Sequence, residues 1–268
     1  MYWRYSCYVD ETPLCLYTFG MSESIAGKKA FVIGGSGGIG AAVSKALAQE
    51  KVILTVHGGH NEEKLNSLVK ELSALTEVSG ILCGIDGGSL PDESCSCGRA
   101  FVRAIEDADI VCVCYGPFLQ KPVSETTSAE WAASVQANLT LPGTIVSKAL
   151  QNMQKRKWGR LLLFGGTGTS SFRSYRTNAV YAAAKTGLCT LVKSVAAEYG
   201  SCGITCNAIL PGFTDTEFVP EEVKAGQRKK MPRGKLIAPE EIAEAAVFLL
   251  RMGCINGALL NVDAGWTP

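Results

Sequence analysis

The sequence predicts an α/β fold built on a doubly wound parallel sheet, with about seven strands and helices on both faces. Short apolar runs alternate along the chain with longer segments of helical periodicity. The runs are apolar at every position, which is typical of parallel strands that are buried on both faces. The first run also passes through a glycine-rich turn straight into a helical segment. Together these observations favour a sheet built from repeated strand–helix units.

The predicted elements alternate in a regular order from Lys29 onward. Crossover connections of this kind require parallel strands, and no repeat or linker interrupts them. The chain from residue 21 to 268 is therefore predicted to form one domain of the Rossmann type. The predicted strands are Ala30–Ile33, Val52–Val56, Gly80–Ile85, Ile110–Val113, Arg160–Phe164, Thr205–Leu210 and Ala258–Val262. The main helical stretches are Gly40–Gln49, Glu62–Leu75, Ala129–Gln154 and Ala179–Tyr199.

The first 20 residues differ in character from the rest of the chain. They lack the basic start and the long apolar centre of a secretory signal. Met21 then opens a segment that leads into the first strand. We therefore predict that residues 1–20 are an appendage outside the fold.

Composition restricts the classes of partner. The chain has 268 residues, of which 47% are hydrophobic and 19% charged, so it can bury a large core. Its 26 basic and 25 acidic residues almost cancel, and no basic stripe is present. Neither nucleic acid nor an anionic membrane is predicted as a partner. No apolar run approaches the ~20 residues that span a bilayer.

The cysteines and histidines do not predict a metal site. Most of the 11 cysteines occur singly or within apolar runs, as small core residues do in a reducing compartment, so a cytoplasmic location is expected. Cys95 and Cys97 are the only close pair outside such a run, and the chain has just two histidines, His57 and His60. A tetrahedral zinc site would need more ligands than this pair offers.

The glycine-rich turn "GGSGGIG" (34–40) is typical of a dinucleotide-binding loop. Gly34, Gly38 and Gly40 have the spacing that lets the backbone turn tightly and approach a pyrophosphate at a helix N-terminus. Glycine clusters alone also make ordinary turns. Here the required strand precedes the loop and the required helix follows it, so dinucleotide binding is predicted.

The segment "NAVYAAAK" (178–185) places Tyr181 and Lys185 four positions apart in a predicted helix, and thus on the same face. A tyrosine with a pKa near ~10 is a poor base at neutral pH. A lysine ammonium nearby favours the phenolate and would make the tyrosine a better acid–base group. On its own, the pair could equally be an ordinary helix surface.

Taken together, these motifs resemble the short-chain dehydrogenase/reductase family over about residues 28–266. Four further segments match in the same order: "IDGG" with Asp86, "VQANLTLPG" with Asn138, "CNAILPGFTDT", and "GALLNVDAG". Two segments depart from the family pattern. "VCYG" keeps only Gly116 of the family's Asn-Asn-Ala-Gly, and the position of the family's catalytic serine falls on Gly166.

The resemblance implies an oxidoreductase in which Tyr181 exchanges a proton with the substrate oxygen. It implies that Lys185 also binds the nicotinamide ribose and that Asn138 holds a water of the proton path. Thr167 is expected to replace the missing serine, with Thr169 and Ser170 as alternatives. The implied catalytic residues are Asn138, Thr167, Tyr181 and Lys185. The implied cofactor contacts are Gly34, Ser36, Gly38, Ile39, Gly40, His57, Asp86, Gly116, Tyr181, Lys185, Pro211, Gly212 and Thr214.

The end of the second predicted strand bears on the choice of cofactor. An NAD-specific site usually places an acidic residue there, but the sequence has His57, two glycines, His60 and Asn61, with Lys64 beyond. A loop without carboxylates and with partial positive charge suits a 2′-phosphate. NADP(H) is therefore predicted, with NAD(H) as the alternative.

The sequence leaves three functions open: an NADP(H)-dependent oxidoreductase of secondary alcohols and ketones, a 3-oxoacyl thioester reductase, and a non-catalytic dinucleotide-binding regulator. The two enzymes would act on a small carbonyl or alcohol substrate, whereas the regulator would turn over none. The basic run Gly226–Lys235, in a predicted lid over residues 214–235, would suit an acidic carrier or be a solvated surface.

The predicted helices Ala129–Gln154 and Ala179–Tyr199 resemble the family's dimer-forming pair, so a homodimer or homotetramer is expected. Phe172 and Tyr175 are expected to pin the loop after Gly166. The expected pocket wall consists of Phe118, Leu119, Phe172, Tyr175, Phe213 and Phe218.

Overall fold

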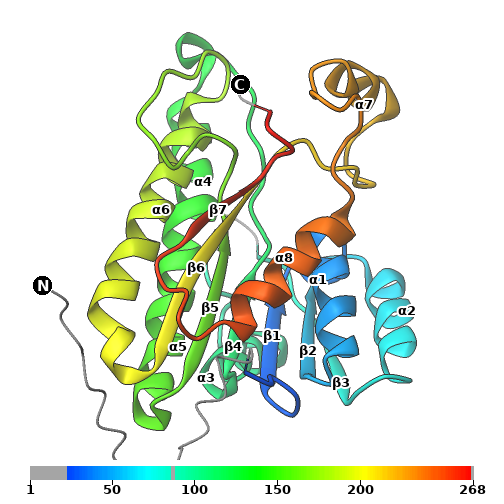
Figure 1. Ribbon diagram of the computed structural model, residues 1–268, viewed down its shortest axis with the longest axis vertical. Coiled ribbons are helices and arrows are strands. Elements are labelled where there is room, and N and C mark those ends of the chain that lie inside the picture. The colour runs from blue at the N-terminus through cyan, green and yellow to red at the C-terminus, as the bar shows by residue number, and fades with distance from the viewer. Residues whose placement is uncertain (1–22, 86–87, 267–268) are drawn as a thin grey trace, which may run out of the picture.

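A computed structural model describes residues 23–85 and 88–266 of the chain. The predicted appendage 1–20 and Asp86 lie outside the described residues. Seven strands form one sheet in the order β3-β2-β1-β4-β5-β6-β7, and every neighbouring pair is parallel. Helices cover both faces (Figure 1). This arrangement confirms the predicted doubly wound parallel sheet.

The strands agree with the apolar runs in the centre of the sheet and differ at its edge. β3 begins two residues earlier than predicted and ends at Leu82, because it pairs with β2 from Leu54 opposite Val78. As an edge strand it is only half-buried, so its apolar pattern is weak. The strands are β1 (Lys29–Ile33), β2 (Ile53–Gly58), β3 (Val78–Leu82), β4 (Ile110–Val113), β5 (Gly159–Phe164), β6 (Ile204–Pro211) and β7 (Leu259–Val262).

Alternating side chains of the strands build two cores. Ala30 and Val32 of β1 belong to the core on one face, and Phe31 and Ile33 belong to the core on the other. The first face is covered by α1 (Gly38–Gln49), α2 (Glu62–Leu72) and α8 (Pro239–Arg251). The second is covered by α3 (Ser96–Asp107), α5 (Leu141–Arg156) and α6 (Ala179–Tyr199). None of the described helices combines the length and the apolar character needed to cross a membrane.

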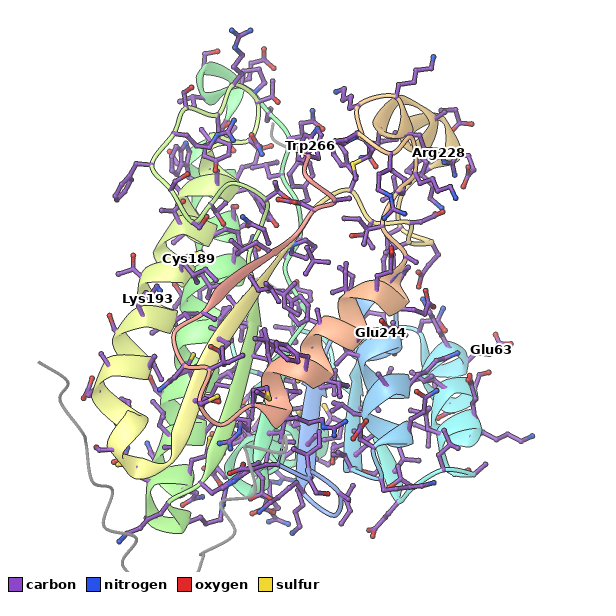
Figure 2. The ribbon with its side chains drawn as sticks, in the orientation of Figure 1. Glu63, Cys189, Lys193, Arg228, Glu244 and Trp266 are labelled. Carbon is purple, nitrogen blue, oxygen red and sulfur yellow. The ribbon has the colours of Figure 1, made fainter. Side chains whose placement is uncertain are left out.

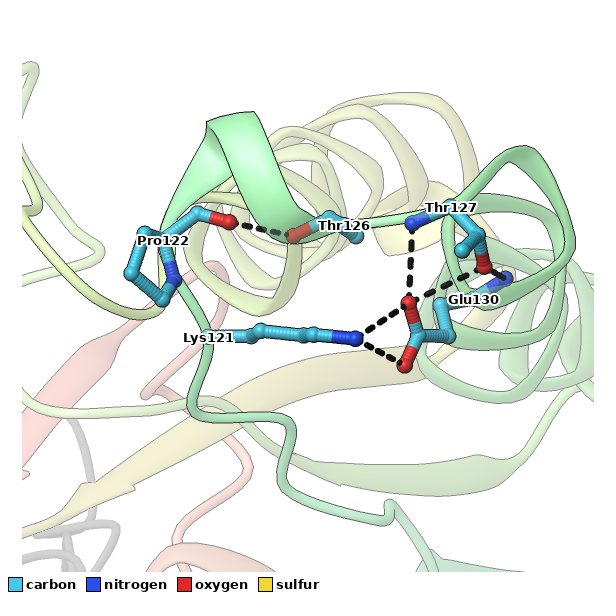
Figure 3. Close-up of polar contacts among 5 residues, drawn as sticks. All are labelled: Lys121, Pro122, Thr126, Thr127 and Glu130. Carbon is cyan, nitrogen blue, oxygen red and sulfur yellow. Dashed lines mark hydrogen bonds and ion pairs between the residues drawn. The ribbon is translucent and has the colours of Figure 1, made fainter.

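The long helix predicted over 129–154 contains an irregular turn. α4 (Ser128–Val135) passes through a π-helical turn, η3 (Gln136–Thr140), into α5. The start of α4 is fixed by a capping box, in which the Glu130 backbone N–H donates to Thr127 Oγ1 at 3.2 Å and the Thr127 N–H donates to Glu130 Oε2 at 2.8 Å. Lys121 pairs with the same carboxylate at 2.9 Å (Figure 3). The π turn then holds Asn138 completely buried.

The remaining short elements lie in the connections. A 3-10 turn, η2 (Val123–Glu125), precedes α4, and η4 (Gly200–Cys202) joins α6 to β6. α7 (Glu221–Arg228) stands beyond the carboxyl ends of the strands, away from the body of the sheet (Figure 1). The segment between β6 and α8 that carries α7, residues 214–235, is called the α7 segment below.

Candidate active site

The candidate site lies at the carboxyl ends of the central strands. The chain leaves β1 toward one face and β4 toward the other, and open α/β sheets bind ligands at such a switch point. Trp266, after β7, and Arg228, in α7, lie at this same end of the molecule (Figure 2). Loops that are distant in sequence therefore meet here.

The glycine loop has the geometry of a phosphate cradle. Gly34 and Gly38 have φ of +72° and +50°, values that favour glycine. A Cβ on Gly40 would lie 2.1 Å from the Gly34 carbonyl oxygen, so the helix packs against the loop with no room for a side chain. Gly37 is the N-cap of α1 and supplies no side-chain cap. The loop therefore has the tight turn and the helix N-terminus that the predicted pyrophosphate site requires.

A carboxylate of the protein itself lies on this cradle. The Gly38 N–H donates to Glu217 Oε1 at 3.0 Å, and the same oxygen pairs with the Lys64 ammonium. Burial opposes ionisation of Glu217, but the hydrogen bonds from Lys64 and Gly38 outweigh it and lower the pKa of the carboxyl. Phe218 lies beside the same glycines, since a Cβ on Gly37 would be 2.7 Å from its Cζ. Nothing in the sequence pattern around Glu217 indicates this contact.

His57 lies beneath the glycine loop. Its Nδ1 accepts the Gly34 N–H at 3.0 Å, and its Nε2 contacts the Cys83 carbonyl oxygen at 2.7 Å. Nδ1 acts as the acceptor and Nε2 as the donor, so the ring is neutral, and desolvation by burial lowers its pKa. This differs from the expectation that His57 offers positive charge to the cofactor. The physical reason is that the side chain of a buried strand end points into the core.

Asn138 and Lys185, two of the predicted catalytic residues, meet at Gly116, a predicted cofactor contact. A Cβ on Gly116 would lie 2.7 Å from Lys185 Nζ and 2.8 Å from Asn138 Oδ1. Asn138 donates from Nδ2 to the carbonyls of Pro117 and Ser134 at 3.0 and 3.1 Å. Its Oδ1 is buried with no hydrogen-bond partner among the described residues. An acceptor held in this way is suited to a bound water or ligand hydroxyl.

Tyr181 and Lys185 share one face of α6, as their spacing predicts. Lys185 Nζ donates to the Phe164 carbonyl at 2.7 Å and lies 5.7 Å from the centre of the Tyr181 ring. Desolvation lowers the pKa of Lys185 to about 8. Desolvation also raises the pKa of Tyr181 above its ordinary value. The expectation that the ammonium favours the phenolate therefore does not describe the ligand-free chain, in which burial dominates and the phenol is neutral.

Gly166 occupies the position beside the tyrosine hydroxyl. A Cβ there would lie 3.4 Å from Tyr181 Oη, which agrees with the alignment of the family's serine to this residue. Thr167 does not replace that hydroxyl, because its Oγ1 donates to the Pro211 carbonyl at 2.7 Å. Thr169 Oγ1 donates to the Gly166 carbonyl at 2.7 Å and closes the turn, while Ser170 is exposed. The orientation of Thr167 thus differs from the prediction, because its hydroxyl joins the ends of β5 and β6.

The expected aromatic wall is only partly assembled. Phe118 contacts the Tyr181 ring edge-to-face at 5.0 Å, and Phe213 packs on Trp266 at 4.2 Å. Phe172 is 97% exposed, so the prediction that it pins the loop is wrong. Tyr175 has a buried hydroxyl with no hydrogen-bond partner among the described residues.

The other predicted cofactor contacts lie around the same strand ends. Ser36 Oγ would be 3.1 Å from a Cβ on Gly58, at the end of β2. Ile39 packs against the core from the first turn of α1. Pro211 ends β6, and Thr214 Oγ1 donates back to the Gly212 carbonyl at 3.0 Å.

Comparisons with known proteins agree with this fold. A family model described as enoyl-(acyl carrier protein) reductase matches residues 34–267. The 3-oxoacyl-(acyl-carrier-protein) reductase FabG of Rickettsia bellii is 30% identical over 249 residues, which cover 90% of this chain and 97% of that protein. The D-beta-hydroxybutyrate dehydrogenase of Cupriavidus necator is 27% identical over 259 residues, with 90% and 98% covered. A solved short-chain dehydrogenase/reductase from Serratia marcescens superimposes with a TM-score of 0.79 at 26% identity, over 92% of this chain and all of that one.

Proposed function

The chain belongs to the short-chain dehydrogenase/reductase family, and from that premise we propose that it interconverts a secondary alcohol and its ketone with NADP(H). Membership makes it an NAD(P)-dependent oxidoreductase that acts on small molecules. The observation that carries the finer proposal is the convergence of Asn138 Oδ1 and Lys185 Nζ on Gly116. Lys185 lies one helical turn after Tyr181 in α6. A binding module would not need a buried, unpartnered acceptor and a desolvated lysine at the same point.

Tyr181 is the proposed proton donor to the substrate oxygen. When bound, the cofactor supplies or accepts the hydride. In the direction of reduction, Tyr181 holds a proton that it gives to the developing alkoxide. The raised pKa of Tyr181 keeps that proton on the phenol until an acceptor arrives. With Thr167 and Thr169 both engaged by carbonyl oxygens, Tyr181 is the hydroxyl that we assign to the substrate oxygen.

Lys185 and Asn138 are proposed to reload the tyrosine. With a pKa of about 8, Lys185 gives up and regains a proton near neutral pH. The unpartnered Asn138 Oδ1 is suited to hold a water between the lysine and solvent. Lys185 would also contact the ribose of the cofactor, because its ammonium approaches the glycine that follows β4.

The preference for NADP(H) rests on the end of β2. No carboxylate occurs between His57 and Asn61, so the acid that binds the ribose of NAD in many relatives of this fold is missing. His57 is hydrogen-bonded to the glycine loop, so the proposal relies on Lys64 for positive charge. Lys64 would meet a 2′-phosphate once it leaves Glu217. A titration in which NAD(H) binds more tightly than NADP(H) would contradict this.

The catalytic proposal is tested by conservative variants of the pair on α6. Tyr181→Phe should lower carbonyl reduction by ~10²–10⁴ and leave NADPH binding nearly unchanged, because only the proton donor is lost. Lys185→Met should weaken both. Tyr199→Phe, at the far end of the same helix, is the matched control and should behave as the native chain. Turnover is followed at the NADPH absorbance band with a panel of ketones. Native rates in Tyr181→Phe would exclude the assignment.

A 3-oxoacyl thioester is the second candidate substrate, because the similarity to a 3-oxoacyl-(acyl-carrier-protein) reductase extends over the whole domain. Within the basic run of the α7 segment, Arg228 is paired with Glu221 at 3.4 Å, so the charge of this residue is less available to an acidic carrier. Comparing an acyl thioester with a simple ketone of equal chain length decides between the two. A non-catalytic regulator is the remaining alternative, and it would bind NADPH without turning over any ketone.

We also propose that the enzyme works as a homodimer or homotetramer in the cytoplasm. All nine cysteines among the described residues are free thiols, as expected in a reducing compartment. The α4–α5 and α6 helices lie side by side on one face and offer the surface for a two-fold contact. Light scattering that reports a monomer at micromolar concentration would contradict the assembly.

A further inference from the structure

Three cysteines that lie apart in the sequence meet at the start of α3. Cys83 follows β3, Cys95 is the N-cap of α3, and Cys97 lies in its first turn. Cys83 Sγ lies 3.0 Å from Cys97 Sγ, and Cys95 Sγ lies 3.2 Å from Cys97 Sγ. Cys97 is therefore the centre of a cluster of three thiols. The catalytic proposal above makes no use of this cluster.

Cys97 is the nucleophile of the cluster by its surroundings. The Cys83 thiol donates a hydrogen bond to its sulfur, and the N–H groups of Cys97 and Gly98 at the helix N-terminus lie beside it. These donors lower the pKa of the Cys97 thiol. Its side chain is also half-buried rather than enclosed, whereas Cys83 is buried. A small reagent can therefore reach Cys97 more readily than Cys83.

We propose that these three cysteines form a thiol–disulfide exchange site, at which Cys97 reacts with a low-molecular-weight disulfide and Cys83 completes a Cys83–Cys97 disulfide. Cys83 is the assigned partner because its thiol is nearest and its proton already points to Cys97. Cys95 is engaged elsewhere: its sulfur accepts the Gly98 N–H at 3.2 Å and donates to the Asp92 carbonyl at 3.0 Å. Oxidising Cys95 would remove the proton that it donates to the Asp92 carbonyl.

The exchange is balanced by the small disulfide as the oxidant. The Cys97 thiolate attacks one sulfur of the reagent, and its S–S bond breaks to release one thiolate. The Cys83 sulfur, after losing its proton, then attacks the Cys97 sulfur of the mixed disulfide and releases the second thiolate. Burial raises the pKa of the Cys83 thiol, so this second step is expected to be the slower one. Two protein thiols are oxidised, and the reagent is reduced to two thiols that carry the two protons.

The proposed disulfide is connected to the glycine loop through His57. The Cys83 carbonyl contacts His57 Nε2 at 2.7 Å, and His57 Nδ1 accepts the Gly34 N–H at 3.0 Å. Closing the gap between the two sulfurs from 3.0 Å to the ~2.05 Å of a disulfide requires a shift of Cys83 or Cys97, and a shift of Cys83 would carry this carbonyl with it. Oxidation is therefore expected to loosen the support of the phosphate cradle. This part rests on the proposed function, whereas formation of the disulfide does not.

The full-length chain is incubated with oxidised glutathione, and its thiols are alkylated and mapped by peptide mass spectrometry. The expected product is a Cys83–Cys97 disulfide that also forms in Cys95→Ser. Cys83→Ser should stop at a Cys97–glutathione mixed disulfide, and Cys97→Ser should form neither. Cys254→Ser, which removes an exposed thiol elsewhere, is the control. A Cys95–Cys97 disulfide, or glutathionylation of Cys97 no faster than that of Cys254, would overturn the assignment.

The connection to the glycine loop has its own measurement. NADPH binding is titrated with the reduced chain, the oxidised chain and the oxidised chain after dithiothreitol. A loss of about 3–10-fold in affinity on oxidation is expected, as for one weakened hydrogen bond, with recovery on reduction. Cys83→Ser should show no such change. Equal affinities in a chain with a mapped disulfide would refute the connection, and absence of NADPH binding in the reduced chain would instead refute the proposed function.

Discussion

Replacing Glu217 by glutamine should strengthen binding of the dinucleotide. The Glu217 carboxylate lies on the Gly38 N–H, where a pyrophosphate would bind, and it neutralises Lys64. A bound cofactor must therefore displace it from the cradle. Glutamine has nearly the same shape but lacks the charge that holds the α7 segment in this place.

The magnitude follows from two contacts. A carboxylate at a helix N-terminus contributes about 0.3–1 kcal/mol. The ion pair with Lys64 contributes at most about 1 kcal/mol, because the two side chains are 34% and 47% exposed and solvent screens them. The amide oxygen of glutamine keeps part of the hydrogen bond. About 1 kcal/mol of competition is thus removed, which corresponds to about 5-fold tighter binding.

The assay is a fluorescence titration with NADPH at low and at moderate salt. The advantage of Glu217→Gln over the native chain should shrink as salt rises, because both contacts are screened. Glu222→Gln removes the same charge from the exposed start of α7 and is the matched control. Equal or weaker binding by Glu217→Gln would refute the reasoning, since it would mean that the carboxylate does not compete with the cofactor.

Two further outcomes are expected. Gly166→Ser places a hydroxyl beside Tyr181 Oη and should raise ketone turnover by up to ~10². Gly166→Ala adds the same carbon without the donor, so equal rates in the two variants would contradict this expectation. Burial lowers the pKa of His57, so below about pH 6.5 the unfolded chain binds a proton that the native ring does not bind. The free energy of unfolding should therefore decrease as the pH is lowered. Urea denaturation should show that this slope is lost in His57→Phe and kept in His60→Asn, which alters an exposed ring; a slope shared by all three chains would exclude His57 as its cause.

The features that sequence alone predicts are those set by periodicity and local sterics. Tyr181 and Lys185 share a helix face because four residues make about one turn, whatever the surroundings. Gly40 must be a glycine because the helix touches the Gly34 carbonyl, and strand–helix order is enough to reveal the loop. The buried central strands were likewise evident from runs that are apolar at each position.

The features that sequence reasoning missed depend on where a side chain points after the loops have packed. His57 follows a polar-looking pattern, but it ends a buried strand and turns inward to Gly34. Thr167 has the right chemistry for the missing serine, yet its nearest acceptor is a carbonyl of β6. Glu217 reaches a glycine loop 179 residues away in the chain, and no local pattern encodes that contact.

The order of the strands has a consequence for how the chain folds. Every neighbour in the sheet is parallel, and the central pairing sets Ala30 of β1 opposite Ile110 of β4, so nothing near the cradle can form as a local hairpin. Such non-local topology folds slowly, because each crossover must close before its contacts form. The glycine loop is synthesised early but gains its neighbours from β4 to β6 only when most of the chain has emerged. A dinucleotide that binds only the completed site would then stabilise the finished chain by mass action, and the cellular pool of cofactor would help to set how much folded enzyme persists.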